Sequence, residues 1–458
     1  MSQSITATST DTPLVDDSRA RIQRLETIAE SLLERARKAG ASQAEVACSE
    51  EQGLSVNVRM GAVDTVEATH DRGISVTVYF GQRKGSASTA DLRETSLDAT
   101  VAQACAIAKH TEADAAAGLA DPERMAQAPG EFDTWHPWDV QADAAIDMAL
   151  ACEAAGRELD SRISNADGTQ VGSGHSLSVY ANSHGFVGAE RHTMHSMSCA
   201  LIAGTGEAMQ RDGWYTLALE SGALEAPREV GRKAAERALS RLDARGLPTG
   251  QMPVLFSAEV ARSLIGHFLS AISGGALYRK ASFLLDSVGQ PVFPEWLSIH
   301  EHPHLQRGLR STAFDAEGVA TVDAPLVSAG VLAHYLLGSY SARKLGLAST
   351  GNAGGVHNLH VAGRGGTLDE LVSEMGDGLL VTELMGQGVN PVTGDYSRGA
   401  AGFRVEGGRI THAVDGITIA GNLRRMFADI RAVGDDIDAR SHIACGSLLV
   451  GGMTVAGE

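Results

Sequence analysis

The pattern that most constrains the fold lies in the C-terminal half of the chain, where short apolar runs alternate with Gly, Asn and Asp turns over residues 253–458. Alternation with a period of two is typical of half-buried strands, and frequent turn residues favour antiparallel connections. Two helices interrupt the pattern, at 258–272 and 367–376. We therefore predict a β-rich, barrel-like C-terminal domain over residues 250–458.

The N-terminal half predicts two regions that each combine helices with an antiparallel sheet. In the first, over residues 24–112, apolar residues at helical spacing begin at Leu25 and stop near Gly40. Four strands follow, with hairpin turns expected at Asp71-Arg72-Gly73 and at 81–85, and a second helix runs near 97–108.

The second region covers residues 141–246. Its expected elements are a helix at 144–159, strands that include 177–181 and 191–202, and a closing helix at 228–242. The predicted fold class is α+β, as a three-part chain.

The connecting segments have their own composition. Residues 1–23 are rich in Ser, Thr and Asp, which predicts a disordered N-terminal tail. Residues 113–140 lose all periodicity and are interpreted as a linker pinned by Phe132, Trp135 and Trp138. The Gly246-Leu-Pro-Thr-Gly250 segment marks the last boundary, because Gly and Pro both stop helices.

Charge and cysteine content exclude several functions. A formal net charge of -18 opposes direct binding to phosphate backbones. The five cysteines are scattered without a Cys-x-x-Cys pair, which indicates buried thiols in place of disulfides or a zinc ribbon. No secretory segment and no apolar run of about 18 residues is present, so we expect a cytoplasmic protein without membrane contact.

The stretch at 265–283 is the first candidate for a site. It begins as an amphipathic helix and breaks at Gly274-Gly275, where the absence of Cβ atoms allows a positive φ and a close approach to another backbone or a ligand. Tyr278, Arg279 and Lys280 follow the break directly.

Four segments of this chain resemble the TldD/PmbA family of bacteria and archaea, and the last three resemble its PmbA (TldE) branch. The resemblance extends from about Glu26 to the C-terminus. The segments are YRKASFLLD at 278–286, GNAGGVHNL at 351–359, MGQGVNPVTGDYSRGAAGF at 385–403 and ITIAGNL at 417–423.

The resemblance also implies what this chain lacks. In the TldD branch, a His-Glu-x-x-x-His helix and a later Cys hold zinc, and the Glu acts as general base. The same positions here hold Gly266, His267 and Ala271. The resemblance therefore implies a subunit that has no catalytic residue and binds no metal, with zinc held by a TldD-like partner.

The implied function is that of the PmbA/TldE-like subunit of a heterodimeric zinc metallopeptidase. Such enzymes cleave unfolded proteins and peptides, in peptide-antibiotic maturation and antitoxin degradation, and this chain would complete the substrate cleft. Because family members are also called modulators of DNA gyrase, the alternative is a stand-alone regulatory protein that acts on gyrase indirectly.

The resemblance and the local chemistry give a set of residues for a cleft that contacts substrate or partner. His267 either points to the partner's metal or a peptide, or is satisfied by packing neighbours. Arg279 and Lys280 either bind a carboxylate or form an internal salt bridge. The 351–359 glycines expose backbone to a peptide or partner, or form tight barrel corners. The set is His267, Tyr278, Arg279, Lys280, Asn352 and His357.

His300, His302 and His304 follow a period of two, which in a strand would align three imidazoles on one face and attract a transition metal. A weaker hypothesis is therefore an autonomous hydrolase with a metal at these residues. Pro303 removes a ladder hydrogen bond and favours a loop, so the preferred interpretation is a surface loop with adventitious metal affinity.

Overall fold

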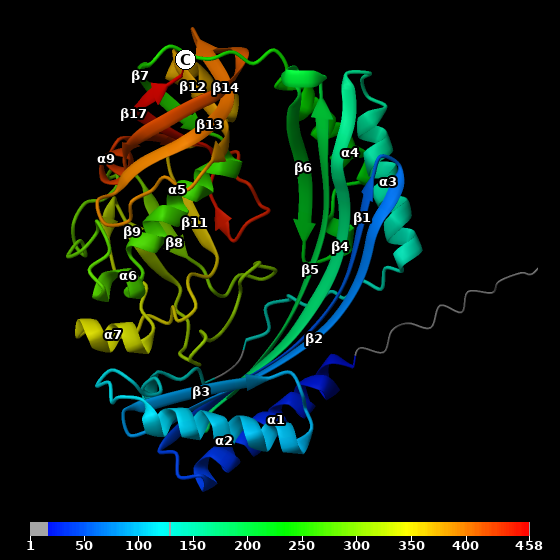
Figure 1. The fold of residues 1–458 in the computed structure, drawn as a ribbon. Helices are drawn as coiled ribbons and strands as arrows, with labels where there is room; N and C mark the ends of the chain where they lie inside the picture. Colours follow the sequence, from blue (N-terminus) through cyan, green and yellow to red (C-terminus); the bar gives the residue numbers. More distant parts are fainter. Residues whose placement is uncertain (1–16, 128–129, 458) are drawn as a thin grey trace, which may run out of the picture.

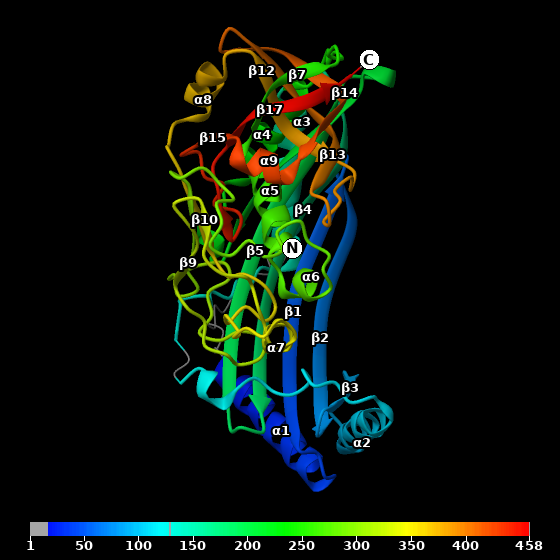
Figure 2. The same cartoon turned by 90° about the vertical axis from the view of Figure 1, so that its left-hand side faces the viewer.

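The computed structural model describes residues 17–127 and 130–457, and in it a long curved antiparallel sheet partly encloses the C-terminal domain. The C-terminal domain lies on the concave side of this sheet (Figure 1). Viewed from that side, the long strands of the sheet lie side by side behind the C-terminal domain (Figure 2).

Within the described residues, the helices include three short 3-10 turns (η). They are α1 (Ser18–Lys38), α2 (Glu94–His110), η1 (Pro122–Arg124), α3 (Ala142–Arg157), η2 (Gly206–Ala208), η3 (Ser221–Ala223), α4 (Pro227–Ser240), α5 (Ala258–Ala271), α6 (Gly274–Tyr278), α7 (Ser339–Leu345), α8 (Leu368–Met375) and α9 (Leu423–Ala428).

The strands fall into three sheets. The N-terminal sheet contains β1 (Gln43–Arg59), β2 (Ala62–Phe80), β3 (Arg83–Thr89), β4 (Ile163–Asn182), β5 (Val187–Ala203) and β6 (Gln210–Ala218). The barrel sheet contains β7 (Gly250–Phe256), β12 (Gly378–Met385), β13 (Asp395–Glu406), β14 (Arg409–Asn422), β15 (Ile430–Val433) and β17 (Leu448–Ala456). The third sheet contains β8 (Ser298–Glu301), β9 (Ala324–Ser328), β10 (Val331–Leu332), β11 (Leu359–Ala362) and β16 (Ile443–Ala444).

The two predicted N-terminal regions share one sheet, in the order β3-β2-β1-β4-β5-β6. The prediction of four strands in the first region is wrong, because the structure has three there, β1, β2 and β3. The turn predicted at Asp71-Arg72-Gly73 is also wrong, because these residues lie inside β2. The hairpin lies at Met60-Gly61, where both residues have positive φ, as a two-residue hairpin turn requires. The exposed side chains of 62–72 gave no alternating pattern from which β2 could be recognised.

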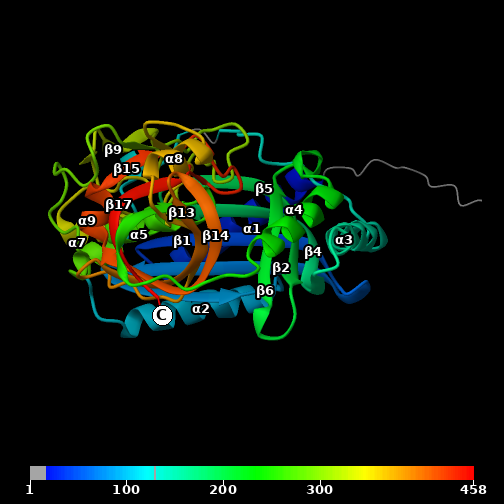
Figure 3. The same cartoon turned by 90° about the horizontal axis from the view of Figure 1, so that it is seen from above.

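Helices cover the convex side of this sheet at both ends. α1 and α2 pack over one end, where Leu25, Leu32 and Val101 join a core with Val76 of β2. α3 and α4 pack over the other end, and in Figure 3 they lie on the side of the sheet that faces away from the C-terminal domain. Because α1 begins at Ser18, the part of the predicted tail at 18–23 is helical, whereas residues 1–16 of that prediction lie outside the described residues.

The C-terminal domain confirms the predicted β-rich barrel. β14, β13, β12, β7 and β17 pair in turn, and the β14–β17 pairing closes the ring. α5 lies against the barrel, where Phe268 packs edge-on against Phe293 and Phe427, with ring centroids 5.0 and 6.1 Å away. α8 begins with a capping box between Thr367 and Glu370, at the position that the sequence predicts.

The C-terminal domain is attached to the sheet near both of its ends. At one end Arg440 stacks on Trp214 of β6 at 4.0 Å and donates to the Tyr215 carbonyl at 2.9 Å. At the other end Lys344 pairs with Asp114 at 2.8 Å, and Arg343 donates to the carbonyl of Gly118 at 3.1 Å. These contacts fix the distance between the domain and the middle of the sheet.

No helix in the described ranges is both long enough and apolar enough to cross a membrane.

Two glycine-to-alanine changes test the contact between α3 and α4. A Cβ on Gly231 of α4 would lie 1.9 Å from the carbonyl oxygen of Cys152 on α3, so we expect Gly231→Ala to lower the free energy of unfolding by roughly 2–3 kcal/mol. Gly266→Ala on α5 is the control: a Cβ there meets nothing within 4 Å, and helix propensity should raise stability by about 1 kcal/mol. Thermal and denaturant unfolding measure both changes, and equal stability of the two variants would contradict the close packing of α3 on α4.

Candidate functional site

A cleft of about 950 Å³ separates the concave face of the sheet from the C-terminal domain. Its sheet wall includes Arg72 of β2 together with Glu190 and His192 of β5, and its other wall includes Arg310 and the glycine loop at 351–357. A second cavity of about 630 Å³ lies on the other side of this loop and shares Arg310 and residues 353–356 with the first. The glycine loop is therefore the partition between two cavities.

The glycine loop is held by the buried carboxylate of Glu301, the last residue of β8. Glu301 Oε1 accepts the backbone N–H of His357 at 2.7 Å and lies 2.8 Å from His357 Nδ1. The Asn352 amide donates to both carboxylate oxygens at 3.0 and 3.1 Å. One side chain thus fixes both ends of the loop.

Asp315 holds the middle of the same loop. Its Oδ2 accepts the Ala353 N–H at 2.9 Å, and its Oδ1 accepts the N–H groups of Glu317 and Val319 at 2.9 and 3.0 Å. Gly354 and Gly355 follow with φ of 94° and 117°, conformations that a side chain would strain. The backbone between the two anchors can therefore line the cleft directly.

The two anchoring carboxylates have opposite pKa shifts. Burial alone would raise the pKa of Glu301, but hydrogen bonds from His357 and Asn352 outweigh it and hold the pKa below its ordinary value. Burial dominates at Asp315 and raises the pKa to about 6 despite three backbone donors. On the facing wall, burial raises the pKa of Glu190 and lowers the pKa of His192. The titratable side chains that line or anchor the cleft are therefore either shifted toward their neutral forms by burial or compensated by hydrogen bonds.

Arg310 is the exception on this surface. Its guanidinium is exposed, lines both cavities and donates to the Val356 carbonyl at 3.2 Å, but it forms no ion pair within the described ranges. An arginine of this kind can donate to a carboxylate or a peptide carbonyl that enters the cleft. The sequence gave no signal for Arg310, since it follows a run of loop residues without periodicity.

The structure brings three of the predicted cleft residues to the two cavities. His357 lines the larger cavity, and Tyr278 and Asn352 line the smaller one. Because Asn352 and His357 are bonded to Glu301, their role in the structure is to shape the loop. The sequence pattern did not indicate Glu301, because the metal-binding pattern in this segment consists of the histidines on either side of it, His300 and His302.

The stretch around Gly274-Gly275 differs from its prediction. The helix ends at Ala271, before the glycines, and neither glycine has a positive φ; Gly274 instead begins the short helix α6. Gly274 is closely approached by a side chain and not by the backbone or ligand that the sequence predicted, because a Cβ on Gly274 would lie 2.2 Å from Ser341 Oγ. Lys280 carries the positive φ, at 56°.

Arg279 and Lys280 point into solvent. Arg279 stacks over the Tyr278 ring at 5.3 Å and donates to its hydroxyl at 3.1 Å. Neither residue forms an ion pair with another part of the chain that the structure describes, so the alternative of an internal salt bridge is wrong. Binding of a carboxylate by these two cations stays a prediction.

His267 lies half-buried on α5, with its ring edge-on to Tyr396 at 6.0 Å. Burial, and then the charge of Arg398, lower the pKa of this imidazole. His267 Nε2, the Tyr396 hydroxyl and Arg398 Nε are buried atoms without a hydrogen-bond partner in the described structure. His267 therefore has packing neighbours, but they do not satisfy its outer nitrogen.

The residues of α5 do not suit a zinc ion. Gly266 and Ala271 offer no ligand atom, and one imidazole cannot hold a tetrahedral ion. Within the described ranges, three or more potential ligands come together at His300, His302 and Asp323, and α5 contributes none of them.

These observations define a cleft-bearing α+β protein made of a curved sheet and a barrel domain. Matches to family models cover most of the chain: PmbA/TldA metallopeptidase domain 1 at 44–108, the central domain at 135–242 and the C-terminal domain at 249–457. The chain belongs to the PmbA/TldD family of metallopeptidases, a class of peptidase-type hydrolases.

Individual relatives agree with this assignment. The protein of Escherichia coli O157:H7 named Metalloprotease PmbA is 48% identical over 415 residues, which cover 91% of this chain and 92% of the relative. A Bacteroides thetaiotaomicron structure named as a modulator of DNA gyrase superposes with a TM-score of 0.90 at 28% identity, over 95% of this chain and 99% of that one. TldE of Thermococcus kodakarensis shares the fold, with a TM-score of 0.81 at 19% identity over 93% of this chain and 99% of that one.

Replacing Glu301 tests the anchor of the glycine loop. Glu301→Gln keeps the shape but sets an NH₂ group against the donors of Asn352 or His357, so we expect the free energy of unfolding at pH 7 to fall by roughly 1–3 kcal/mol. Because the folded-state pKa of Glu301 is lowered, its contribution is present above the unfolded pKa and is lost as pH falls through the folded value. The difference between wild type and variant should therefore shrink in acid, as measured by denaturant unfolding from pH 7 to pH 3. A difference that stays constant with pH would contradict the ionised anchor.

Proposed function

We propose that this chain is the PmbA/TldE-like subunit of a heterodimeric zinc metallopeptidase, in which a TldD-like partner holds the zinc and the general base. In this proposal the chain supplies no catalytic residue, binds no zinc at α5 and completes a cleft for unfolded proteins and peptides. Peptide-antibiotic maturation and antitoxin degradation are the substrate processes that the family resemblance suggests.

The composition of α5 is the single observation that carries the proposal. A zinc peptidase needs three protein ligands and an open position for water. At the corresponding positions this chain has Gly266, His267 and Ala271, which together provide one nitrogen. Hydrolysis by a zinc ion at α5 therefore needs ligands from a second polypeptide.

The cleft supports a role in substrate binding. Its loop wall exposes backbone at Gly354 and Gly355, and its cationic group, Arg310, is free of internal ion pairs within the described ranges. Contacts to backbone and to carboxylates are common to all peptides and depend little on side-chain sequence. Such a surface suits a peptidase that acts on unfolded chains of varied sequence.

The free edge of β2 supports an interaction with a partner protein. β3 pairs with β2 only from Ile74 to Phe80, so the preceding part of β2 has no strand on its outer side among the described residues. Val63 and Val66 are exposed apolar side chains on this segment, and Met60 in the turn before it is exposed as well. A long unpaired edge with apolar side chains readily adds a strand from another chain.

The direct test is reconstitution. The chain is purified alone and together with the TldD-like protein encoded in the same genome, and zinc content and peptide hydrolysis are measured for each. We expect stoichiometric zinc and activity in the mixture, and neither zinc at α5 nor hydrolysis in the isolated chain. Hydrolysis by the isolated chain would overturn the proposal.

Replacing Arg310 tests the cleft within the active mixture. Loss of a charge-assisted hydrogen bond to substrate should lower kcat/KM by roughly 10- to 100-fold in Arg310→Ala, with zinc content unchanged. Arg24→Ala is the matched control, because it removes the same charge from an exposed position on α1. Equal kinetics for the two variants would remove Arg310 from substrate binding.

A second candidate is a stand-alone regulatory protein that affects DNA gyrase indirectly. The name of the Bacteroides thetaiotaomicron structure favours it, and the net charge of -18 argues against an effect through DNA contact. This candidate predicts that no stable complex forms with the TldD-like protein. A stable, active complex favours the peptidase subunit.

A further inference from the structure

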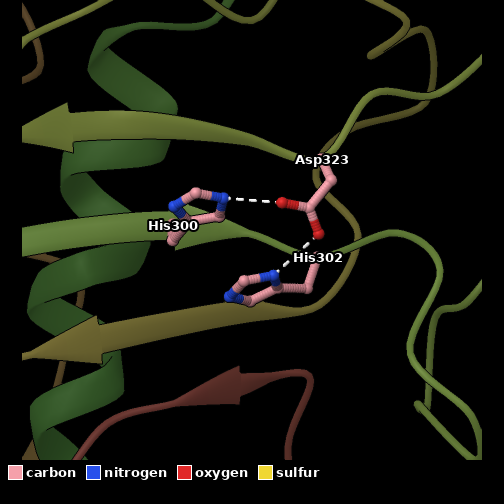
Figure 4. A group of neighbouring side chains, drawn as sticks. All are labelled: His300, His302 and Asp323. Carbon is pink, nitrogen blue, oxygen red and sulfur yellow. Dashed lines mark hydrogen bonds and ion pairs between the residues drawn. The ribbon is translucent and has the colours of Figure 1, made fainter.

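His300 and His302 of the third sheet share one carboxylate (Figure 4). His300 Nε2 lies 2.7 Å from Asp323 Oδ1, and His302 Nδ1 lies 2.8 Å from Asp323 Oδ2. The two imidazole rings are stacked, with centroids 4.4 Å apart and planes 14° from parallel. Each of the three residues has one possible metal-ligand atom, a ring nitrogen or a carboxylate oxygen, that lies within 4.8 Å of the corresponding atoms of the other two.

The local fold explains why two of the three histidines converge. β8 places Glu301 on its buried side and His300 on its exposed side, and His302 follows directly after the strand. Asp323 immediately precedes β9, which pairs with β8, so its carboxylate reaches both rings. Pro303 then diverts the chain.

His304 is separated from this group. Its Nε2 lies 2.9 Å from Thr321 Oγ1, and its ring stacks on Phe132 at 5.5 Å. The expectation that Pro303 breaks the strand pattern is therefore confirmed, while an aspartate distant in sequence takes the place of the third imidazole.

We propose that His300, His302 and Asp323 form a binding site for a divalent transition metal ion such as Zn²⁺. Two imidazole nitrogens and one carboxylate oxygen form a three-ligand set that zinc accepts, with the remaining coordination position open to water. Ligand atoms around tetrahedral zinc are about 3.3 Å apart, so the N···O pairs, which are 2.7 and 2.8 Å apart, must open by about 0.5 to 0.6 Å. The three side chains are 30 to 51% exposed and have room for this adjustment.

Metal binding requires a particular tautomer of each ring. The nitrogen that faces Asp323 must offer its lone pair to the metal, and the proton is then carried by the opposite nitrogen. The second nitrogens, His300 Nδ1 and His302 Nε2, point away from the carboxylate (Figure 4). Because the two stacked rings have planes only 14° from parallel, their in-plane lone pairs do not meet at one point, so one or both rings must turn about their side-chain bonds when the metal binds.

The site is independent of the peptidase zinc. It lies on the exposed side of the third sheet, uses none of the α5 residues and is complete within one chain. Bound metal would tie β8 to the segment before β9 and stabilise the strand that carries Glu301. The expected role is structural reinforcement of the cleft wall.

Metal titration of the isolated chain tests the proposal. After treatment with a chelator, the protein is titrated with zinc sulfate by calorimetry, and its melting temperature is measured with and without zinc. We expect one saturable site at this position and a rise in melting temperature. Replacements His300→Ala, His302→Ala and Asp323→Asn should each weaken this binding by roughly 10- to 100-fold and abolish the rise.

His304→Ala is the matched control, because it removes a neighbouring imidazole that lies outside the group. It should bind zinc like wild type, and melting temperatures without zinc report whether each variant is folded. Absence of saturable binding, or equal binding by all four variants, would overturn the site. The titration measures metal binding and not hydrolysis. A negative result here therefore does not bear on the proposed subunit function, and a negative reconstitution result does not bear on this metal site.

Discussion

The pairing of β1 on both of its edges is the constraint on which the rest of the structure depends. β1 pairs with β2 from Gln43 to Arg59 and with β4 from Glu45 to Val58, so nearly every residue of this strand is bonded on two sides. This pairing joins two helical layers, each with its own core, into one continuous wall. A wall anchored to the C-terminal domain near its ends leaves the middle of the concave face for a cleft.

The surface of that cleft depends on two buried carboxylates. A buried carboxylate without hydrogen-bond donors is costly, and here donors from the glycine loop and from residues 317 and 319 compensate both carboxylates. Glu301 receives side-chain and backbone donors and stays ionised, whereas Asp315 receives backbone donors alone, and burial raises its pKa. The donors to Glu301 and one donor to Asp315, the Ala353 N–H, belong to the glycine loop, so these bonds compensate the carboxylates and also fix the loop.

Local sequence patterns predicted the elements that carry their own signals. α4, α5 and α8 have strong helical periodicity and clear ends, and they lie within two residues of the predicted positions. The exposed half of β2 has no such pattern, because its register comes from pairing with β1. The two predicted regions form one sheet because β1 pairs with β4, and a pairing between strands so far apart in the sequence cannot be predicted from local patterns.

The candidate site divides in the same way. Tyr278, Asn352 and His357 were found through sequence segments that resemble a family, and the structure places them beside the two cavities. Glu301, Asp315 and Arg310 have no local signal, since their roles arise from contacts with segments 38 to 56 residues away. Asp323 completes the histidine pair for the same reason, across 21 and 23 residues.

The alternation of β8 connects the inner and outer surfaces of the third sheet. Successive side chains of a strand point to opposite faces, so Glu301 holds the glycine loop while His300 and His302 meet Asp323 outside. Any interaction that restrains the outer pair also restrains the backbone of the anchor between them. β8 is therefore the direct covalent connection between the anchor of the cleft loop and the surface cluster, whose residues do not line the cleft.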